Sequence, residues 1–564
     1  MRESLLKSDV EMAPNRDTAH TTTLLDLPDE LIDQILAEVK WGAPTAPSAL
    51  DTLQFYETLT QNTASIQLVR LTCRRLASRA STVLLPVASV SISDPASINR
   101  LEQIANHPTF APYVKAVHVC FDFYEAELAA DPRALATYLL HLWHGSTLLT
   151  GLEGPLWARI INDWKAVCNG EKAIQQRDSQ GDNQEGVQLL SRLHLEYKRR
   201  YEAQQRLGPS LVQRIANAMA LMPRATRLVL DDGPATLRVG NIPAILTPST
   251  QEELEWLIPP TRWATAFKLG RGSPPIETLF SVPSAVHKAG VKLTGLRIHR
   301  LQLPYMLPLW RPAANQHWEW TDPPLPETVE LRSACRWLRV FEFTPGYPSE
   351  RWPVAAVPTD TPSEWPGDRD SHLWPHKMGL YEVLEHILTA SRELTHVRVD
   401  LHKIHAGVSY HLSNKHPNSW PWPRIRVFHL ENGELETTTV PRFLRATAGT
   451  LAELHLHDMW LCSYAARGFS WASLLDQLRA HNGATGTTGG RPTIRLRRPR
   501  GAEFVWLDLS DDDRAHLDSL FDHVGDDDDG LSAVDRFIQG LGGDCNPVVE
   551  ACTTRGLKKS VVWA

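Results

Sequence analysis

The sequence lacks several features that would place it in a large class of proteins. It has no run of about eighteen apolar residues, the length that a bilayer-spanning helix needs. Residues 1–23 are polar and lack the apolar core of a secretory signal. The seven cysteines are scattered and include no Cys-x-x-Cys pair, which is typical of a reducing compartment. We therefore expect a cytoplasmic or nuclear protein with no membrane partner.

The common catalytic motifs are also missing. The sequence has no G-x-x-x-x-G-K-[ST] or G-x-G-x-x-G loop to hold a phosphate, no G-x-S-x-G turn and no H-E-x-x-H. The acidic run at residues 525–530 fails as a calcium loop, because the twelfth ligand place would fall on Arg536. We expect no catalytic residue and no cofactor, and hence a protein that is not an enzyme.

One group of histidines raises the question of a metal site. Its spacing is irregular, no cysteine lies near it, and Lys403 and Lys415 would repel a cation. The group consists of His402, His405, His411 and His416. We expect no metal.

Composition predicts an ordinary globular protein of several units. The chain has 564 residues, enough for three or four domains at roughly 100–200 residues each, unless they merge into one array. Apolar residues make up 42% and charged residues 22%, and the net charge is −7. Because basic and acidic residues are interspersed, nothing points to nucleic acid as a partner.

Residues 24–39, LLDLPDELIDQILAEV, predict one short amphipathic helix. Pro28 suits the first helical position, and the next two residues place negative charge in the first turn, where the helix dipole favours it. The aliphatic residues recur at helical spacing and so form one stripe. They are Leu31, Ile32, Ile35, Leu36 and Val39. This helix needs an apolar partner.

A second helical pattern follows a loop-like spacer. Residues 66–81, IQLVRLTCRRLASRAS, place Leu68, Val69, Cys73, Leu76 and Ala80 on one face of a helix. The two segments together form a small helical module at the start of the chain.

LPDELIDQIL followed by LVRLTCRRLASRA resembles the F-box, which opens with Leu-Pro-x-Glu and an aliphatic helix and continues with an arginine-rich helix. The resemblance covers residues 23–85, with residues 1–22 expected to be a disordered tail, and its spacer is longer than the family's. It implies docking on a Skp-family adaptor, and through it on the cullin scaffold of a ubiquitin ligase. The residues it assigns to the adaptor contact are Leu27, Pro28, Leu31, Ile32, Ile35, Leu36, Leu68, Val69, Cys73 and Leu76.

In the rest of the chain, apolar residues recur at i, i+3 and i+5, the L-x-x-L-x-L spacing of a leucine-rich-repeat strand. Such triplets also arise by chance, so those preceded by a helical pattern count most. The triplets are Val87-Val90-Ile92, Val114-Val117-Val119, Leu293-Leu296-Ile298, Leu338-Phe341-Phe343, Leu394-Val397-Val399, Ile425-Phe428-Leu430, Leu451-Leu454-Leu456, Phe504-Leu507-Leu509 and the weaker Ala225-Leu228-Leu230. Helical patterns precede those at Val114, Leu228, Val397 and Leu454. We expect residues 86–564 to be an irregular α/β array similar to a leucine-rich-repeat solenoid.

Large insertions interrupt this array, at about residues 120–222 and 345–378. Residues 171–186 are polar without apolar periodicity and predict a mobile loop. The second insertion is rich in proline and contains three Trp-Pro pairs, at Trp352, Trp365 and Trp374. These tryptophans either pin the loop to the array or form an exposed recognition surface.

The residues between the strand leucines are predicted to face the concave surface, because strand side chains alternate. Most are charged or histidine, which suits recognition of a target protein, although exposed strand positions are ordinarily polar. These candidate target-binding residues are Arg297, His299, Glu342, Arg398, Asp400, His429, Glu431, His455 and His457.

The expected function is therefore that of a substrate-receptor subunit, an arrangement similar to F-box proteins of filamentous fungi. Two alternatives stay open. One is a repeat scaffold with no role in a ligase, and the other is an enzyme whose site is a deep pocket around His429, His455 and His457. The basic run at residues 495–500 fits either a nuclear signal or a strand end and turn.

Overall fold

The computed structural model describes residues 24–41, 63–144, 155–170, 185–232, 258–263, 266, 276–301, 306–307, 326–344, 378–401, 422–435, 439–461, 470–484, 491–501, 510–522 and 531–555. The expected tail at 1–22, the Trp-Pro pairs, the histidines between 402 and 416 and the acidic run at 525–530 lie outside these residues. So does most of the predicted loop at 171–186, of which only residues 185 and 186 are described, in a helix.

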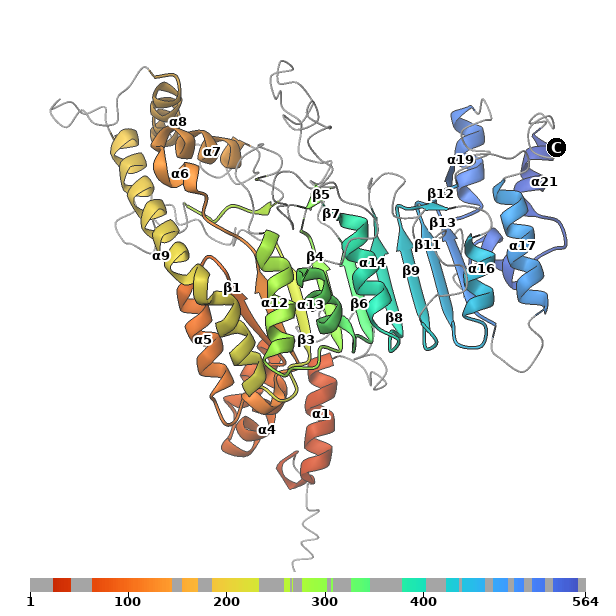
Figure 1. Ribbon diagram of the computed structural model, residues 1–564, viewed down its shortest axis with the longest axis horizontal. Coiled ribbons are helices and arrows are strands. Elements are labelled where there is room, and N and C mark those ends of the chain that lie inside the picture. The colour runs from red at the N-terminus through yellow and green to blue at the C-terminus, as the bar shows by residue number, and fades with distance from the viewer. Residues whose placement is uncertain are drawn as a thin grey trace, which may run out of the picture.

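The described residues contain one nine-stranded parallel sheet, so the predicted α/β class is confirmed (Figure 1). Each strand of this sheet is parallel to the next strand of the sheet along the chain, in the order β1-β2-β3-β4-β6-β8-β9-β11-β13. The strands are β1 (Val87–Ser91), β2 (Ala116–Cys120), β3 (Arg227–Asp231), β4 (Gly295–His299), β6 (Val340–Thr344), β8 (His396–Asp400), β9 (Val427–Glu431), β11 (Glu453–His457) and β13 (Thr493–Arg497).

The strands form where apolar residues alternate, and their second and fourth side chains are buried in one continuous core. Leu454 and Leu456 of β11, for example, are almost completely buried. Seven of the nine predicted triplets lie in these strands at matching positions of the register.

Two strand predictions need correction, and one cannot be compared. In β1, Ala88 pairs with Val117, so the core triplet begins at Leu85 and the prediction was two residues late. Because Ala88, the second residue of this core triplet, is small, the sequence pattern instead began at Val87. The sequence pattern missed β13, because Arg491 occupies the place of its first apolar residue. The triplet at Phe504 lies outside the described residues.

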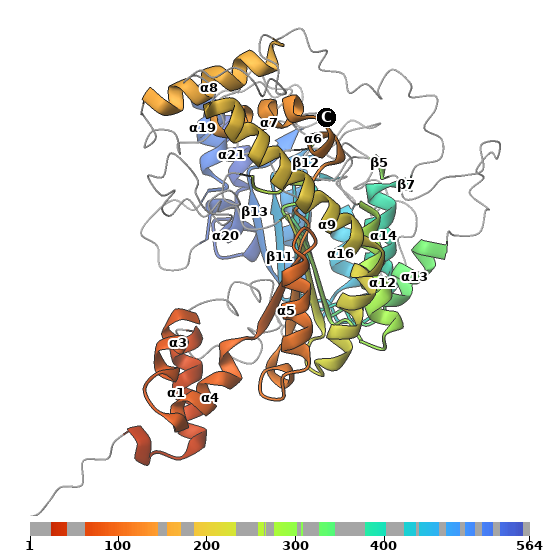
Figure 2. The ribbon, with the colours of Figure 1, turned by 90° about the vertical axis from the view of Figure 1, so that its left-hand side faces the viewer.

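Helices cover one face of the sheet, and most of them are followed, after a connection of four to six residues, by the next strand (Figures 1 and 2). This confirms the four predicted strand-preceding helices. The helices on this face are α5 (Pro95–Ala105), α9 (Glu185–Leu221), α12 (Ile276–Lys288), α13 (Pro326–Cys335), α14 (Leu380–Ala390), α16 (Thr439–Ala446) and α17 (Trp471–Ala484). At the far end, α19 (Asp511–Ser519), α20 (Ala533–Gln539) and α21 (Pro547–Thr554) complete the core. Among the described helices, none combines the length and apolar character needed to cross a membrane.

The chain turns sharply after several strands, at a residue with positive φ. Arg300, Asn432, Asp458 and Arg498 each follow the last residue of a strand. After three of these turns a second parallel ladder forms from β10 (Glu434–Leu435), β12 (Trp460–Leu461) and β14 (Arg500–Gly501). The basic run at 495–500 is therefore a strand end and turn, as one interpretation predicted. A separate antiparallel pair joins β5 (Met306–Leu307) to β7 (Met378–Gly379).

The insertion predicted at about 120–222 contains a helical unit with its own core, which the sequence did not reveal. The unit consists of α6 (Ala126–Ala130), α7 (Pro132–His144), α8 (Pro155–Cys168) and the amino-terminal half of α9. Trp164, Tyr138 and Tyr197 are its largest buried side chains. The second half of α9, beyond Pro209, joins the core of the sheet. One long helix thus ties the unit to the sheet (Figure 1).

The chain begins with a separate three-helix group, visible at the foot of Figure 2. It comprises a short 3-10 turn (Leu24–Asp26), α1 (Asp29–Trp41), α3 (Thr63–Arg70) and α4 (Arg74–Leu84). Pro28 lies just before the first helix rather than inside it. The helix predicted at 66–81 is two helices, because the Cys73 sulfur accepts from Leu76 N and caps α4. As a consequence Leu68 is exposed while Leu76 is buried, so the predicted common face is wrong.

Ion pairs and a small apolar core hold the three helices together. Ile32 and Leu36 of α1 pack against Ile66, Leu76 and Ala80. Arg75 of α4 donates to Asp29 Oδ1 at 2.7 Å and to the Leu27 carbonyl at 2.9 Å. Arg79 pairs with Asp29, and with Asp33 at 3.2 Å. These pairs are partly exposed, so the apolar core supplies most of the stability.

Lys40 is buried in this group, and we expect Lys40→Met to stabilise it. Burial lowers the pKa of Lys40 to about 8, and its ammonium donates to Thr63 Oγ1 at 2.6 Å. We expect the removal of the buried charge to outweigh the loss of hydrogen bonding by the ammonium, for a gain of about 2 kcal/mol at pH 7. Because the folded pKa is depressed, the wild type alone should gain stability as the pH rises from about 8 towards 10.5. Hydrogen exchange in α1 at pH 7 and pH 9.5 measures both effects, and equal protection of the two proteins at pH 7 would refute the argument.

Candidate binding face of the sheet

The face of the sheet opposite the helices carries two rows of mostly polar side chains. They come from the third and fifth residue of each strand, which the pleat directs away from the core. The third-position row is Ser89, His118, Val229, Arg297, Glu342, Arg398, His429, His455 and Arg495. The fifth-position row is Ser91, Cys120, Asp231, His299, Thr344, Asp400, Glu431, His457 and Arg497. We call these two rows the binding face.

All nine predicted target-binding residues lie on the binding face, on five strands from β4 to β11. The parallel register places residues that are far apart in the sequence next to one another, such as Arg297 beside Glu342. Their side chains are not fully exposed: Glu342 is buried, and His429, Glu431 and His455 are only 14–16% exposed. The residues were therefore placed correctly, but they are more enclosed than a simple polar surface.

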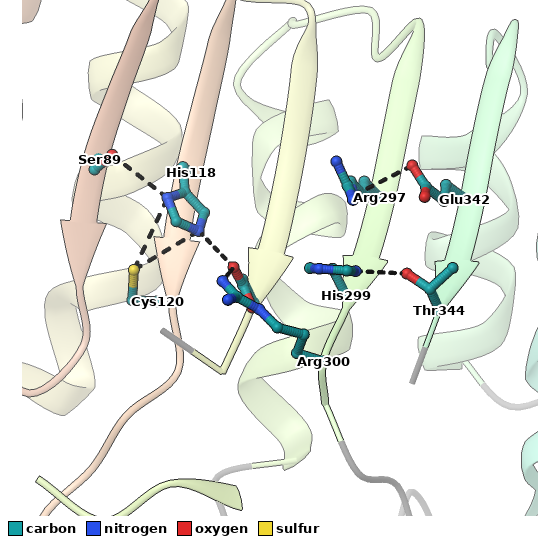
Figure 3. A network of polar contacts seen from close by, with 9 residues as sticks. Ser89, His118, Cys120, Arg297, His299, Arg300, Glu342 and Thr344 are labelled. Atoms are coloured by element: carbon teal, nitrogen blue, oxygen red, sulfur yellow. Dashed lines mark hydrogen bonds and ion pairs between the residues drawn. The ribbon is translucent and has the colours of Figure 1, made fainter. Parts of the chain in front are cut away.

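Opposite charges alternate along the middle of the face. Arg297 Nε lies 3.2 Å from Glu342 Oε2, and Arg398 lies between Glu342 at 3.8 Å and Glu431 at 2.9 Å (Figure 3 shows the first of these pairs). Because Glu342 is buried, its charge depends on these two guanidinium groups. These contacts link four neighbouring strands, from β4 to β9, through their side chains.

Three histidines surround Glu431 on β9 and β11. The ring of His429 lies 4.7 Å from that of His457 and 5.2 Å from that of His455, measured between centroids. Burial would raise the pKa of Glu431, but His429 and Arg398 outweigh it and hold the pKa at about 2. Burial and the neighbouring His429 lower the pKa of His457 to about 4. At neutral pH the cluster therefore combines an ionised carboxylate with an uncharged imidazole at His457.

A second polar cluster occupies β2 and β3, and the sequence did not predict it. His118 Nε2 lies 3.2 Å from Asp231 Oδ2, and Arg300 Nε donates to Asp231 Oδ1 at 2.9 Å. Figure 3 shows His118 between Ser89 and Cys120, with Arg300 reaching across from the turn after β4. Asp231 is almost completely buried, and these contacts outweigh its burial and lower its pKa. The sequence did not reveal this pair because His118 and Asp231 are 113 residues apart. The available signal was that both occupy outward-facing positions of neighbouring strands.

Cysteine, histidine and aspartate together raise the question of a nucleophilic site. The Cys120 sulfur lies 3.9 Å from His118 Nδ1 and 3.7 Å from Nε2, so neither nitrogen is singled out as a base. Burial, together with Asp122 and Asp231, raises the pKa of the Cys120 thiol, whereas a catalytic cysteine needs a lowered one. The arrangement can hold the strands together but is poorly suited to attack a substrate.

Comparison of the chain with models of protein families, with curated proteins and with solved structures gives no match. The functional argument accordingly depends on the geometry of the molecule itself.

Proposed function

We propose that this chain is the substrate receptor of a Skp-cullin-F-box type ubiquitin ligase. In this proposal the three-helix group is an F-box-like module, and the sheet with its helices is an irregular leucine-rich-repeat-like array. The first binds a Skp-family adaptor, and the second binds a target protein. The chain makes and breaks no covalent bond. It raises the concentration of the target near the ubiquitin carried by another subunit.

The observation that carries the proposal is an exposed aliphatic stripe on α1. Ile32 and Leu36 face the core of the group, whereas Leu31, Ile35 and Val39 are 37–42% exposed. Leu68 and Leu71, in and after α3, are 67% and 82% exposed. Several large aliphatic side chains exposed on one small unit are typical of a surface that another protein covers.

The ten residues expected to contact the adaptor divide into two sets. Ile32, Leu36 and Leu76 are buried and so are better suited to stabilising the group than to docking. Pro28, Leu31, Ile35 and Leu68 are exposed, and Leu27, Val69 and Cys73 are intermediate. We accordingly assign the adaptor contact to the exposed and intermediate residues of the ten, together with Val39 and Leu71.

A double substitution, Leu31→Asp with Ile35→Asp, tests the docking step. Both side chains are exposed, so the change should leave the fold intact while placing two charges in the interface. In the complex the adaptor would bury both aliphatic side chains, so losing them should cost about 3 kcal/mol or more of binding free energy. This corresponds to an increase of about 100-fold in the dissociation constant. Titration of the purified chain with a Skp-family adaptor measures the dissociation constant.

Gln34→Asp with Gln67→Asp is the matched control, because it adds the same charge at exposed polar positions of α1 and α3. We expect it to bind as the wild type does. Equal binding by both double variants, or no adaptor binding by the wild type, would contradict the proposal and leave the alternative of a repeat scaffold without a ligase role.

A further inference from the structure

Four residues form a square on two adjacent strands of the binding face. His429 and Glu431 lie two residues apart on β9, and their register partners on β11 are His455 and His457. The ligand atoms of His429, Glu431 and His457 all lie within 4.8 Å of one another. Because β9 and β11 are each paired with a neighbouring strand on both sides, these three groups are held close together before any ligand arrives.

The contact between His429 and Glu431 is short but poorly directed for a hydrogen bond. His429 Nε2 lies 2.9 Å from Glu431 Oε1, yet this buried nitrogen has no hydrogen-bond partner, because its direction does not fit one. A nitrogen and an oxygen at this separation, neither donating to the other, have the relative placement of two ligands of one cation. A metal–ligand distance of about 2.0–2.2 Å for each is compatible with their separation.

The chemical types also fit a borderline-soft divalent cation. Two imidazoles and one carboxylate are a ligand set that zinc accepts while retaining an open position. Arg398 Nη2 also donates to Glu431 Oε1 at 2.9 Å, so a cation held between this oxygen and His429 Nε2 would share the oxygen with that ion pair.

We propose that His429, Glu431 and His457 form a binding site for Zn²⁺ or a similar divalent transition metal on the binding face. The site follows from side-chain geometry and does not depend on the adaptor contact. The sequence prediction of no metal considered the histidines between 402 and 416, which lie outside the described residues. The pair at 429 and 431 falls within one strand, and His457 lies on the next, so their proximity appears only in the register.

Zinc titration of the full chain, stripped with a chelator, tests the proposal. We expect Glu431→Gln and His457→Gln each to lose one bound Zn²⁺ or to weaken that site by more than about tenfold, because losing a ligand costs at least as much as losing a residue that merely orients one. His107→Gln is the matched control. It replaces an exposed histidine outside the sheet, whose Nδ1 accepts from Thr109 N at 3.1 Å, and its zinc binding should equal that of the wild type.

Cobalt supplies a second readout that does not depend on counting ions. Co²⁺ added to the wild type should give a visible absorption band from a site with imidazole ligands, and both ligand variants should lose it. Circular dichroism checks that each variant is folded, and His429→Gln replaces any variant that is not. Zinc affinity and cobalt spectra of the folded ligand variants that equal those of the wild type would overturn the proposal, as would a wild type that binds neither ion.

Discussion

Asp231→Ala is expected to destabilise the amino-terminal half of the sheet by about 3 kcal/mol, because it leaves a buried histidine and a half-buried guanidinium without their carboxylate. Asp231 is 1% exposed and is in contact with both His118 and Arg300. The two partners come from β2 and from the turn after β4, so one side chain links three strands. Asp231→Asn keeps the shape and part of the hydrogen bonding and should cost less.

Hydrogen exchange of peptides from β2, β3 and β4 measures the local free energy of opening. Asp544→Ala is the control, since Asp544 forms an ion pair of 2.7 Å with Arg479 while fully exposed, and solvent screening should make its loss almost without effect on stability. The folded pKa of Asp231 is lowered, so its contribution is present above its unfolded pKa of about 3.9 and is lost as the pH falls below that value. Similar costs for the two alanine variants at pH 7 would show that the buried network adds little.

Phe341→Ala is the second large effect that we expect, at about 3–5 kcal/mol. Phe341 is completely buried at the second position of β6, where Leu296 and Val397 are its neighbours across the register. Removing the ring leaves a cavity between the sheet and the helices that cover it, and the pairing of β6 on both sides limits how far the backbone can move to fill it. Urea unfolding of the sheet, followed by circular dichroism, measures the loss.

Two further variants distinguish the effect of a cavity in the core from the effect of shortening any side chain. Phe341→Leu refills most of the space and should cost less than about 1.5 kcal/mol. Leu195→Ala shortens a side chain of α9 that is 70% exposed and should leave the unfolding midpoint almost unchanged. If Phe341→Ala unfolded at the same urea concentration as Leu195→Ala, the described packing around β6 would be wrong.

The alternation of apolar residues predicted most of the sheet, because a strand buried on one face must repeat every second residue. It succeeded at Leu454 and Leu456, where both core positions carry large side chains. It failed at Ala88, because the search for large apolar residues did not detect this small side chain. It also failed at Arg491, where a charged residue replaces the first apolar residue of the triplet. Size and charge at single positions thus limited the prediction of strands.

Contacts between distant segments were harder to predict. The polar residues of β4 to β11 were assigned to one face from their strand positions alone, and all of them lie there. His118, Asp231 and Arg300 were missed, because nothing local in the sequence relates them. The separate core around Trp164 was missed for the same reason, since its helices depend on packing that sequence periodicity does not specify.

The sequential order of the strands has a consequence for the size of any bound segment. Nine strands make eight intervals of about 4.8 Å, so the binding face is about 38 Å wide. A peptide extended across the strands, at about 3.4 Å per residue, would need about eleven residues to reach from β1 to β13. Such a peptide would contact the strands in the order in which they occur along the chain. Each strand added to or removed from the sheet would change the number of peptide residues needed to cross it by about one and a half.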